Sequence, residues 1–218
     1  MRTNLDRRLT EILGINSQKR CGAAMAIVSI NNYIHWTYFL SVEEDLERLS
    51  RFIEFNQKNY ECFSLEIVRL LMAAAAEVDV VCKRICHGFE PGCNADNINK
   101  YREIILPKYP QLATFTVTGP RYGLTLKPWE KWNSDKNPFW WDAYNSVKHS
   151  RHTDYYKANL KNVLNAIAGL YVVCLYLYKE KAESGELTPT PRILRPSMDR
   201  YGGVGIGGFD TVFSYKLS

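Results

Sequence analysis

The chain has 218 residues, of which 46% are hydrophobic and 23% are charged. These proportions are ordinary for a globular protein, and they exclude a disordered or fibrous chain. A chain of this length buries a core that needs neither disulfides nor a structural metal. We therefore expect a single domain over residues 1–218, and the polar, charged N-terminus predicts no signal peptide.

Cysteine usage and hydropathy bear on the cellular compartment. The six cysteines are sparse for a disulfide scaffold, which favours reduced thiols in a cytoplasmic protein. The most apolar stretch, residues 166–178, is shorter than the roughly 20 residues that span a bilayer. We expect no membrane partner and interpret this stretch as part of a buried helix.

Positive charge is concentrated in one segment. Residues 100–161 hold 11 Lys or Arg and 5 Asp or Glu, whereas the other 156 residues hold 17 and 18. The same segment holds 12 of the 28 aromatic residues. Basic and aromatic residues together suit contacts to phosphates and stacking on bases. The alternative is that the aromatic residues are core and the lysines are solvated.

The first predicted helices precede the basic segment. Residues 1–40 are ambiguous, with one candidate amphipathic helix over residues 5–13. Ser41 and Glu44 form a capping box, which predicts a helix over residues 42–59. The apolar stripe of that helix would contain Leu46, Leu49, Phe52, Ile53 and either Phe55 or Asn56.

Residues 64–86 form the clearest predicted helix, because they contain no Gly or Pro. Six apolar residues share one face at the 3.6-residue period: Ile67, Leu71, Ala74, Val78, Val81 and Ile85. Residues 73–76 are all alanine and would let a neighbouring helix approach closely, and Gly88 and Pro91 end the helix. A short helix is expected next, over residues 96–105.

Residues 107–137 interrupt the helical pattern. Within them, residues 111–126 predict a small β-hairpin or an irregular insertion. Asn137 and Pro138 begin a helix over residues 138–150, and a further helix is expected over residues 154–181. The inward face of that last helix would contain Leu160, Val163, Leu164, Ile167, Leu170, Tyr171, Cys174 and Leu175.

The expected fold is mainly α, an up-and-down bundle of four to five helices with a small hairpin or irregular insertion. Residues 182–218 would form a tail or an edge segment packed on the bundle. Within them, three glycines match the spacing of a dinucleotide fingerprint: Gly203, Gly205 and Gly208. The residues that follow alternate like a strand rather than opening a helix, so we expect no nucleotide loop there.

Metal-ligand residue types cluster once, at the end of the helix over residues 64–86. The cluster contains Cys82, Cys86, His87 and Cys93. The spacing of Cys82 and Cys86 fits a pair of zinc ligands, but no second pair of ligands follows at a zinc-finger distance. We therefore expect buried thiols, no metal and no cofactor.

Residues 140–152, WWDAYNSVKHSRH, carry the most informative constellation. On a helix, Trp141, Asn145 and His149 fall within about 80° of one another, and His152 joins them if the helix continues. Lys148 is adjacent. Such a polar and basic face can bind an anion, and His exchanges protons near neutral pH. The alternative is a solvated helix end whose cations complement the helix dipole.

Glu66 and Arg69 lie three residues apart near the start of the helix over residues 64–86. At that spacing they form a surface ion pair. If this end of the helix faces a cleft, the pair would instead position a basic group toward a phosphate.

The helix pair, the segment YNSVKHSRH and the long apolar final helix resemble the HEPN superfamily over roughly residues 42–181. Many HEPN proteins are metal-independent ribonucleases, often dimeric, in toxin–antitoxin or antiviral systems, and others are non-catalytic binding modules. The resemblance implies that Asn145 orients a phosphate or the His ring, that Lys148 neutralises developing charge, and that His149 is the general acid or base. Catalytic members carry Arg, then four to six residues, then His, and no Arg stands there before His149 or His152.

Two hypotheses of function follow. The first is an HEPN-like protein that binds or processes RNA, with a binding surface formed by Glu66, Arg69, Trp141, Arg151 and His152. The second is a non-catalytic helical interaction module that binds a protein or nucleotide partner, with a homodimer expected in either case. The missing Arg favours the second hypothesis, and the concentration of positive charge favours a nucleic-acid partner for both. A metal-dependent hydrolase is disfavoured, because no predicted helix pairs Glu with His at ligand spacing.

Overall fold

The computed structural model of the chain describes residues 33–207 and 210–218. The chain divides into two units, Met1–Ile34 and His35–Ser218. The helix expected over residues 5–13 lies outside the described residues.

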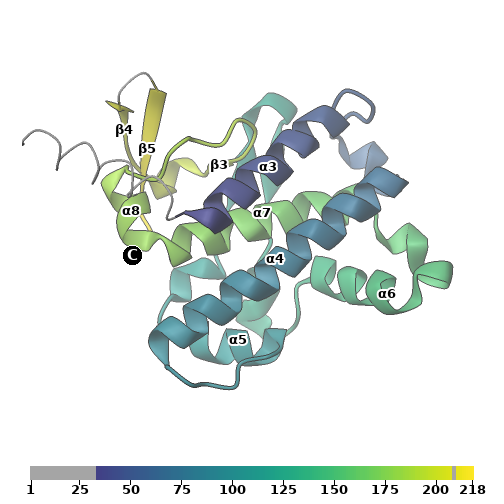
Figure 1. Cartoon of the computed structure of the whole chain (residues 1–218). Helices are drawn as coiled ribbons and strands as arrows, with labels where there is room; N and C mark the ends of the chain where they lie inside the picture. Colours follow the sequence, from purple (N-terminus) through teal and green to yellow (C-terminus); the bar gives the residue numbers. More distant parts are fainter. Residues whose placement is uncertain (1–32, 208–209) are drawn as a thin grey trace, which may run out of the picture. The chain divides into compact units, whose positions relative to one another are not determined.

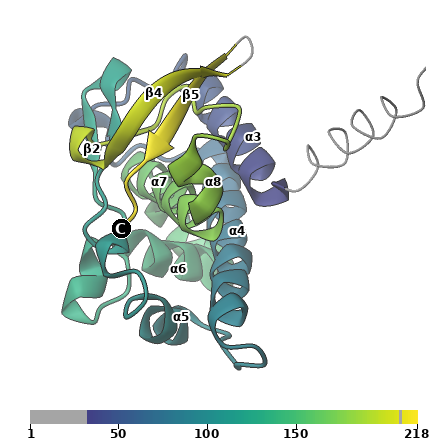
Figure 2. The ribbon, with the colours of Figure 1, turned by 90° about the vertical axis from the view of Figure 1, so that its left-hand side faces the viewer.

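Helices dominate the second unit, which confirms the prediction of a mainly α protein. The α-helices are α3 (Ile34–Leu49), α4 (Leu65–Phe89), α5 (Ile98–Ile105), α6 (Phe139–Asp154), α7 (Leu160–Leu177) and α8 (Lys179–Ser184). Short 3-10 helices connect them at Gln57–Asn59, Pro110–Leu112, Pro120–Tyr122, Glu130–Ser134, Tyr155–Lys157 and Met198–Arg200. In Figures 1 and 2, α7 runs through the middle, the strands lie toward the top, and α5 and α6 lie toward the bottom.

Small antiparallel strand pairs complete the fold. Strand β1 (Val117–Gly119) pairs with β2 (Leu124–Leu126) on one side and with β3 (Arg195–Pro196) on the other. Strand β4 (Tyr201–Gly207) pairs with β5 (Asp210–Tyr215). The predicted hairpin is confirmed, and residues 182–218 form an edge segment rather than a free tail. Gly203 and Gly205 lie in strand β4.

The core is built on α4 and α7, which pack against each other. All six residues predicted for the inner face of α4 are buried, and the side-chain oxygen of Ser64 caps the helix by accepting the N–H of Ile67 at 3.2 Å. The predicted inward face of α7 is also buried, and so is every residue from Val163 to Tyr176, because other elements cover this part of α7 on every side. Among the described residues, α7 is long and apolar enough to cross a membrane, but 89% of it is buried inside the fold.

The prediction of a helix over residues 42–59 is wrong at both ends. The structure begins α3 at Ile34 and ends it at Leu49, so Ser41 lies exposed within the helix and caps nothing. Trp36 and Phe39 are fully buried on the same face as Leu46, and this packing extends the helix upstream of the capping signal. Phe52 falls outside the helix and is 84% exposed.

The boundaries of the last two long helices also differ from the expectation. Helix α6 continues to Asp154, with a non-helical conformation at Ser150 (φ −137°, ψ 45°). Helix α7 begins only at Leu160, because the side chain of Asn159 caps it by accepting the N–H of Asn162. A break at Tyr178 separates α7 from α8, so the single helix expected over residues 154–181 is two helices.

The aromatic residues of the basic segment are mainly core, so their interpretation as stacking platforms is wrong for most of them. Trp129, Trp132 and Trp140 are at most 1% exposed and form one cluster, with ring centroids 4.4 Å and 5.3 Å from that of Trp129. The indole N–H of Trp129 donates to the carbonyl of Gly169 on α7, and that of Trp140 donates to the carbonyl of Pro128. The cluster fastens residues 127–141 to the centre of the fold.

The C-terminal segment is held to α3 by one buried carboxylate. Glu43 is 2% exposed, and its two side-chain oxygens accept the backbone N–H groups of Arg192, Ile193 and Leu194 at 2.8–2.9 Å. Burial raises the pKa of Glu43. Glu43 therefore has a structural role, because its carboxylate is occupied by the neighbouring backbone.

Candidate functional site

A cleft of about 540 Å³ lies between α4, the start of α5 and the middle of α6. Its lining residues are Ala76, Asp79, Val80, Lys83, Asp96, Asn97, Ile98, Trp141, Tyr144, Asn145 and Lys148. Three of the residues selected from the sequence, Trp141, Asn145 and Lys148, are among them. They reach the cleft together because they lie four and seven residues apart on α6, which places them on one face of that helix.

The acidic side chains of this cleft already have partners. The carboxylate of Asp79 contacts the Lys83 ammonium at 2.5 Å and accepts the hydroxyl of Tyr101 at 2.7 Å. Burial and this hydrogen bond raise the pKa of Tyr101, which keeps its hydroxyl protonated as a donor. Asp96 pairs with Lys100 at 3.0 Å, which lowers the pKa of that carboxyl.

Among the described residues, no acidic side chain pairs with Lys148, whereas the other lysine that lines the cleft, Lys83, pairs with Asp79. The Lys148 ammonium lies 5.5 Å from the centre of the Tyr144 ring, and the side chain is exposed. Within the described part of the chain, the half-buried amide of Asn145 has no hydrogen-bond partner. The cleft therefore offers an anion one free positive charge and one free amide, side by side on α6.

Trp141 forms part of the wall. It is 5% exposed and packs against Trp140 and Tyr144, with centroid distances of 5.9 Å and 5.3 Å. A ring covered in this way presents too little of its face to stack on a base. Trp141 thus supports the position of Asn145 rather than providing a platform.

His149 lies outside the cleft lining, although it directly follows Lys148 and is exposed. His149 lies one helical turn beyond Asn145, about 40° from it around α6, and the part of α6 that lines the cleft ends at Lys148. The structure therefore brings Asn145 and Lys148 together in the cleft without His149. It also interrupts the helix at Ser150, so the expected alignment of His152 with Trp141 and Asn145 does not follow from helix geometry.

The end of α6 nevertheless gathers basic side chains on the surface. Lys148, His149, Arg151 and His152 are all exposed, and none of them pairs with an acid among the residues that the structure describes. Lys157, on the next turn, is instead held by Asp154 at 2.9 Å. The exposed end of α6 is consequently a basic surface next to the cleft.

Glu66 and Arg69 lie elsewhere, near the start of α4. The Arg69 guanidinium contacts the carboxylates of both Glu66 and Asp45, at 2.5 Å and 2.6 Å. The hydrogen bonds from Arg69 lower the pKa of Glu66. Residue 69 is ten residues from Asp79, or about 15 Å along the helix, so Glu66 and Arg69 are separate from the cleft. Of the two interpretations of this pair, the surface ion pair fits better than a basic group aimed at a phosphate in a cleft.

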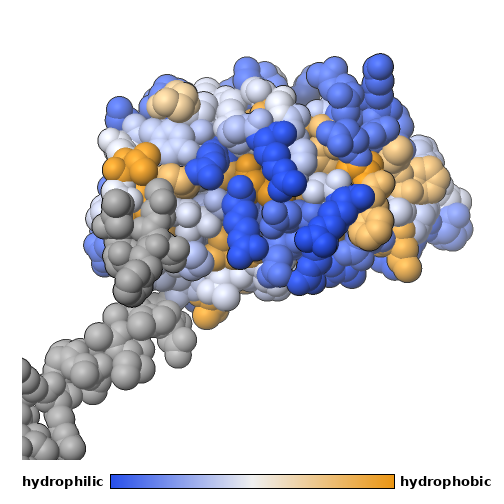
Figure 3. Space-filling model, turned by 90° about the horizontal axis from the view of Figure 1, so that it is seen from above, coloured by the Kyte–Doolittle hydropathy of each residue, from blue (hydrophilic) through white to orange (hydrophobic). Residues whose placement is uncertain are grey.

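The other strongly charged surface consists of paired charges. Figure 3 looks onto the side that carries α3 and the strands, and hydrophilic side chains cover much of it. On α3, Arg48 contacts Glu44 at 2.7 Å, and Glu47 is contacted by both Arg121 and Arg192, at 3.4 Å and 3.6 Å. Since each of these cations has an acidic neighbour, this surface attracts an anion less than the end of α6 does.

The cysteine cluster at the end of α4 has no metal-binding geometry in the described ranges, where no group of three or more ligand side chains converges. Cys82 and Cys86 are fully buried, and burial raises the pKa of Cys86 to about 12. Both thiols therefore stay protonated at neutral pH and act as small apolar side chains.

Sequence reasoning missed the α4 and α5 walls of the cleft. Asp79 and Lys83 interrupt an apolar helix at a spacing of four residues, which was the available signal for them. Asn97 caps α5 by accepting the N–H groups of Asn99 and Lys100, and its place beside α6 depends on the tertiary fold. No family model, curated protein or solved structure matches this chain.

Proposed function

We propose that this protein binds single-stranded RNA through the end of α6, as an HEPN-like protein would. The observation that carries the proposal is the basic surface at that end, where Lys148, His149, Arg151 and His152 are exposed without acidic partners among the described residues. Phosphates are the anions that such a surface attracts, because they release counterions when Lys or Arg neutralises them.

The roles of the residues follow from their positions. Lys148 and Arg151 contact phosphates, and Asn145 donates its amide N–H to a phosphate or base that enters the cleft. His149 is the general acid or base if the RNA is cleaved, and its place outside the cleft lining favours binding without cleavage. The bound strand lies across α6, at the edge of the cleft. We place this activity in the cytoplasm, where cysteines of this kind remain reduced.

A titration of labelled single-stranded RNA, followed by fluorescence anisotropy at two salt concentrations, tests the proposal. Lys148→Ala should weaken binding roughly fivefold at 0.1 M salt and reduce the salt slope by about 0.7, the value for one phosphate contact on a single strand. Lys136→Ala is the matched control, since it removes an exposed lysine of the same basic segment outside α6. Absence of binding at low salt, or equal effects of the two substitutions, would contradict the proposal.

Cleavage is tested separately by running the RNA on a gel after incubation. If the protein is a ribonuclease, His149→Ala should leave most of the affinity and reduce the rate by roughly 10²–10⁴. If the unmutated protein cleaves no RNA, the binding function stands without the enzyme.

A second candidate function, the interaction module, is favoured by an apolar patch near the start of α4. Phe52, Phe63 and Leu65 are 84%, 51% and 75% exposed, beside a groove of about 370 Å³ lined in part by Leu49 and Ile53. Exposed apolar patches often mark protein contacts. We propose that the patch pairs two copies of the chain. Sedimentation should then give a dimer mass that falls to the monomer in Phe52→Ser/Leu65→Ser.

A further inference from the structure

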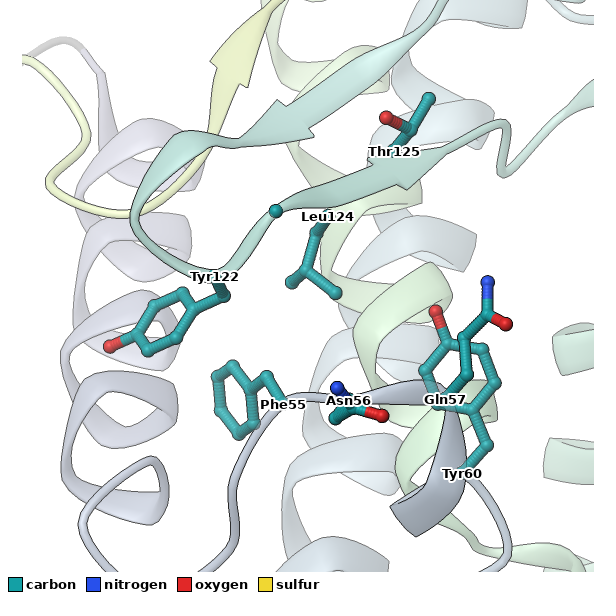
Figure 4. Close-up of a pocket in the computed structure, with 8 residues that line it drawn as sticks. Phe55, Asn56, Gln57, Tyr60, Tyr122, Leu124 and Thr125 are labelled. Carbon is teal, nitrogen blue, oxygen red and sulfur yellow. The ribbon is translucent and has the colours of Figure 1, made fainter.

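A second hollow, of about 390 Å³, lies between the loop after α3 and strand β2 (Figure 4). Its lining residues are Phe55, Asn56, Gln57, Tyr60, Tyr122, Gly123, Leu124 and Thr125. None of these side chains carries a formal charge. The hollow therefore suits a neutral ligand that combines an apolar face with hydrogen-bonding edges, in contrast to the cleft that Lys148 lines.

Two aromatic rings of this hollow contact another ring or a cation, and a third does not. Phe55 packs against Tyr122 with ring centroids 4.9 Å apart, and the Tyr122 hydroxyl is hydrogen-bonded to Ser50 at 2.9 Å. Arg121 covers Tyr122 at 5.4 Å. The half-buried ring of Tyr60, by contrast, has no aromatic or cationic partner among the described residues. Figure 4 shows Tyr60 on the opposite side of the hollow from Phe55 and Tyr122.

Free hydrogen-bonding groups accompany this ring. The amide of Gln57 is exposed and has no partner within the described ranges, whereas the side-chain oxygen of Asn56 accepts the N–H of Lys58. A primary amide both donates and accepts, which matches the mixed edge of a nucleobase.

The backbone of Thr125 adds a donor and an acceptor. Ser197 donates its N–H to the carbonyl of Thr116. Because successive residues of a strand direct their N–H and carbonyl groups to opposite sides, the backbone groups of Thr116 and Thr118 point toward β3. By the same alternation, the backbone groups of Val117 and Gly119 point toward β2, where their partners are Leu126 and Leu124. Thr125 therefore directs its N–H and carbonyl away from β1, at the outer edge of a three-stranded sheet, toward the hollow that it lines.

We propose that this hollow binds a nucleobase. The base stacks on Tyr60, and its edge hydrogen-bonds to the Gln57 amide and to the N–H and carbonyl of Thr125. An added peptide strand fits less well, because β2 has three residues and directs the backbone of only one outward. The absence of a charged lining side chain places any phosphate outside the hollow, near Lys58 and Arg121, which neighbour lining residues in the sequence. This proposal does not rest on RNA binding by α6.

The test is a titration of the full chain with the four ribonucleosides, followed by isothermal calorimetry. At least one nucleoside should bind, and Tyr60→Ala should weaken it about tenfold or more, as loss of a stacking ring does. Tyr60→Phe keeps the ring and should retain most of the affinity. Gln57→Ala should weaken binding and reduce discrimination between bases. If no nucleoside binds at millimolar concentration, or if Tyr60→Ala binds as the unmutated chain does, the proposal is overturned.

Thr125→Pro tests the geometry of the edge. Proline removes the outward N–H but no ladder hydrogen bond, so the variant should keep its melting temperature within a few degrees and lose nucleoside affinity. Unchanged affinity in the folded variant would contradict the role of Thr125. Lys148→Ala separates the two proposals, because it should weaken the binding of an RNA strand and leave nucleoside binding unchanged. A second titration with single-stranded RNA as competitor shows whether the base comes from a strand or from a free nucleoside.

Discussion

The two halves of α6 have the same secondary structure and opposite surroundings. From Phe139 to Val147 the helix is anchored, with Trp140, Trp141, Ala143, Tyr144 and Val147 buried. From Lys148 to Asp154 none of its residues is buried, and the helix is irregular at Ser150. The comparison shows how a rigid aromatic anchor can hold a short basic segment at the surface. The first half determines where α6 lies, and the second half remains free to contact a partner.

The largest effect should come from the anchor itself. Trp140 is fully buried, donates to the Pro128 carbonyl and contacts Trp129. Trp140→Ala should lower the free energy of unfolding by about 3–5 kcal/mol, because it leaves a large cavity and an unpaired carbonyl. Chemical denaturation measures this loss. A loss below about 1 kcal/mol would mean that the first half of α6 is not anchored in this way.

The next effect concerns the close approach between α6 and α7. A Cβ added at Gly169 would lie 2.8 Å from Cζ2 of Trp140, which is closer than real contacts allow. Gly169→Ala should therefore destabilise the fold by about 1–3 kcal/mol despite the better helix propensity of alanine. Ala168→Gly on the same helix is the control. It lowers helix propensity and removes the packing of one methyl group, but it creates no steric clash, and its denaturation is measured in the same way. If Gly169→Ala were stabilising, the packing of Trp140 on Gly169 would be looser than described.

Substitutions in the second half should separate binding from stability. The double variant Lys148→Ala/Arg151→Ala removes two exposed cations, so its free energy of unfolding should change by no more than about 0.5 kcal/mol. Its affinity for RNA should fall by roughly 25-fold at 0.1 M salt, about fivefold for each phosphate contact. Parallel denaturation and anisotropy measurements check both statements. A large loss of stability would show that the end of α6 is part of the core.

The smallest effect is expected at Ser150, where the two halves of α6 differ most in backbone geometry. Ser150→Ala favours helix by a few tenths of a kcal/mol and should leave the melting temperature nearly unchanged. RNA affinity should change by less than twofold, because the substitution removes no charged side chain. A larger change in affinity would indicate that the conformation at Ser150 positions the basic side chains.

Much of the helical content could be predicted from local pattern. The period of apolar residues and the absence of Gly and Pro located α4 to within a few residues, and the Asn137-Pro138 start located α6. Helix α3 was misplaced because a capping box is a weak local signal. The burial of Trp36 and Phe39, a tertiary effect, determines where that helix begins.

The sequence by itself determined the mainly helical class and the face of α6 that carries Asn145 and Lys148, because both follow from the spacing of residues along single helices. For residues 111–126 it left a hairpin and an irregular insertion open, and the pairing of β1 with β2 decides for the hairpin. Only the tertiary structure decided which aromatic residues are core, since burial depends on contacts between distant segments such as Trp129 and Gly169. It also decided that Asp79 and Asn97 face α6 and that Tyr60 lies beside Thr125. No local pattern records these juxtapositions, because each joins elements that are far apart along the chain.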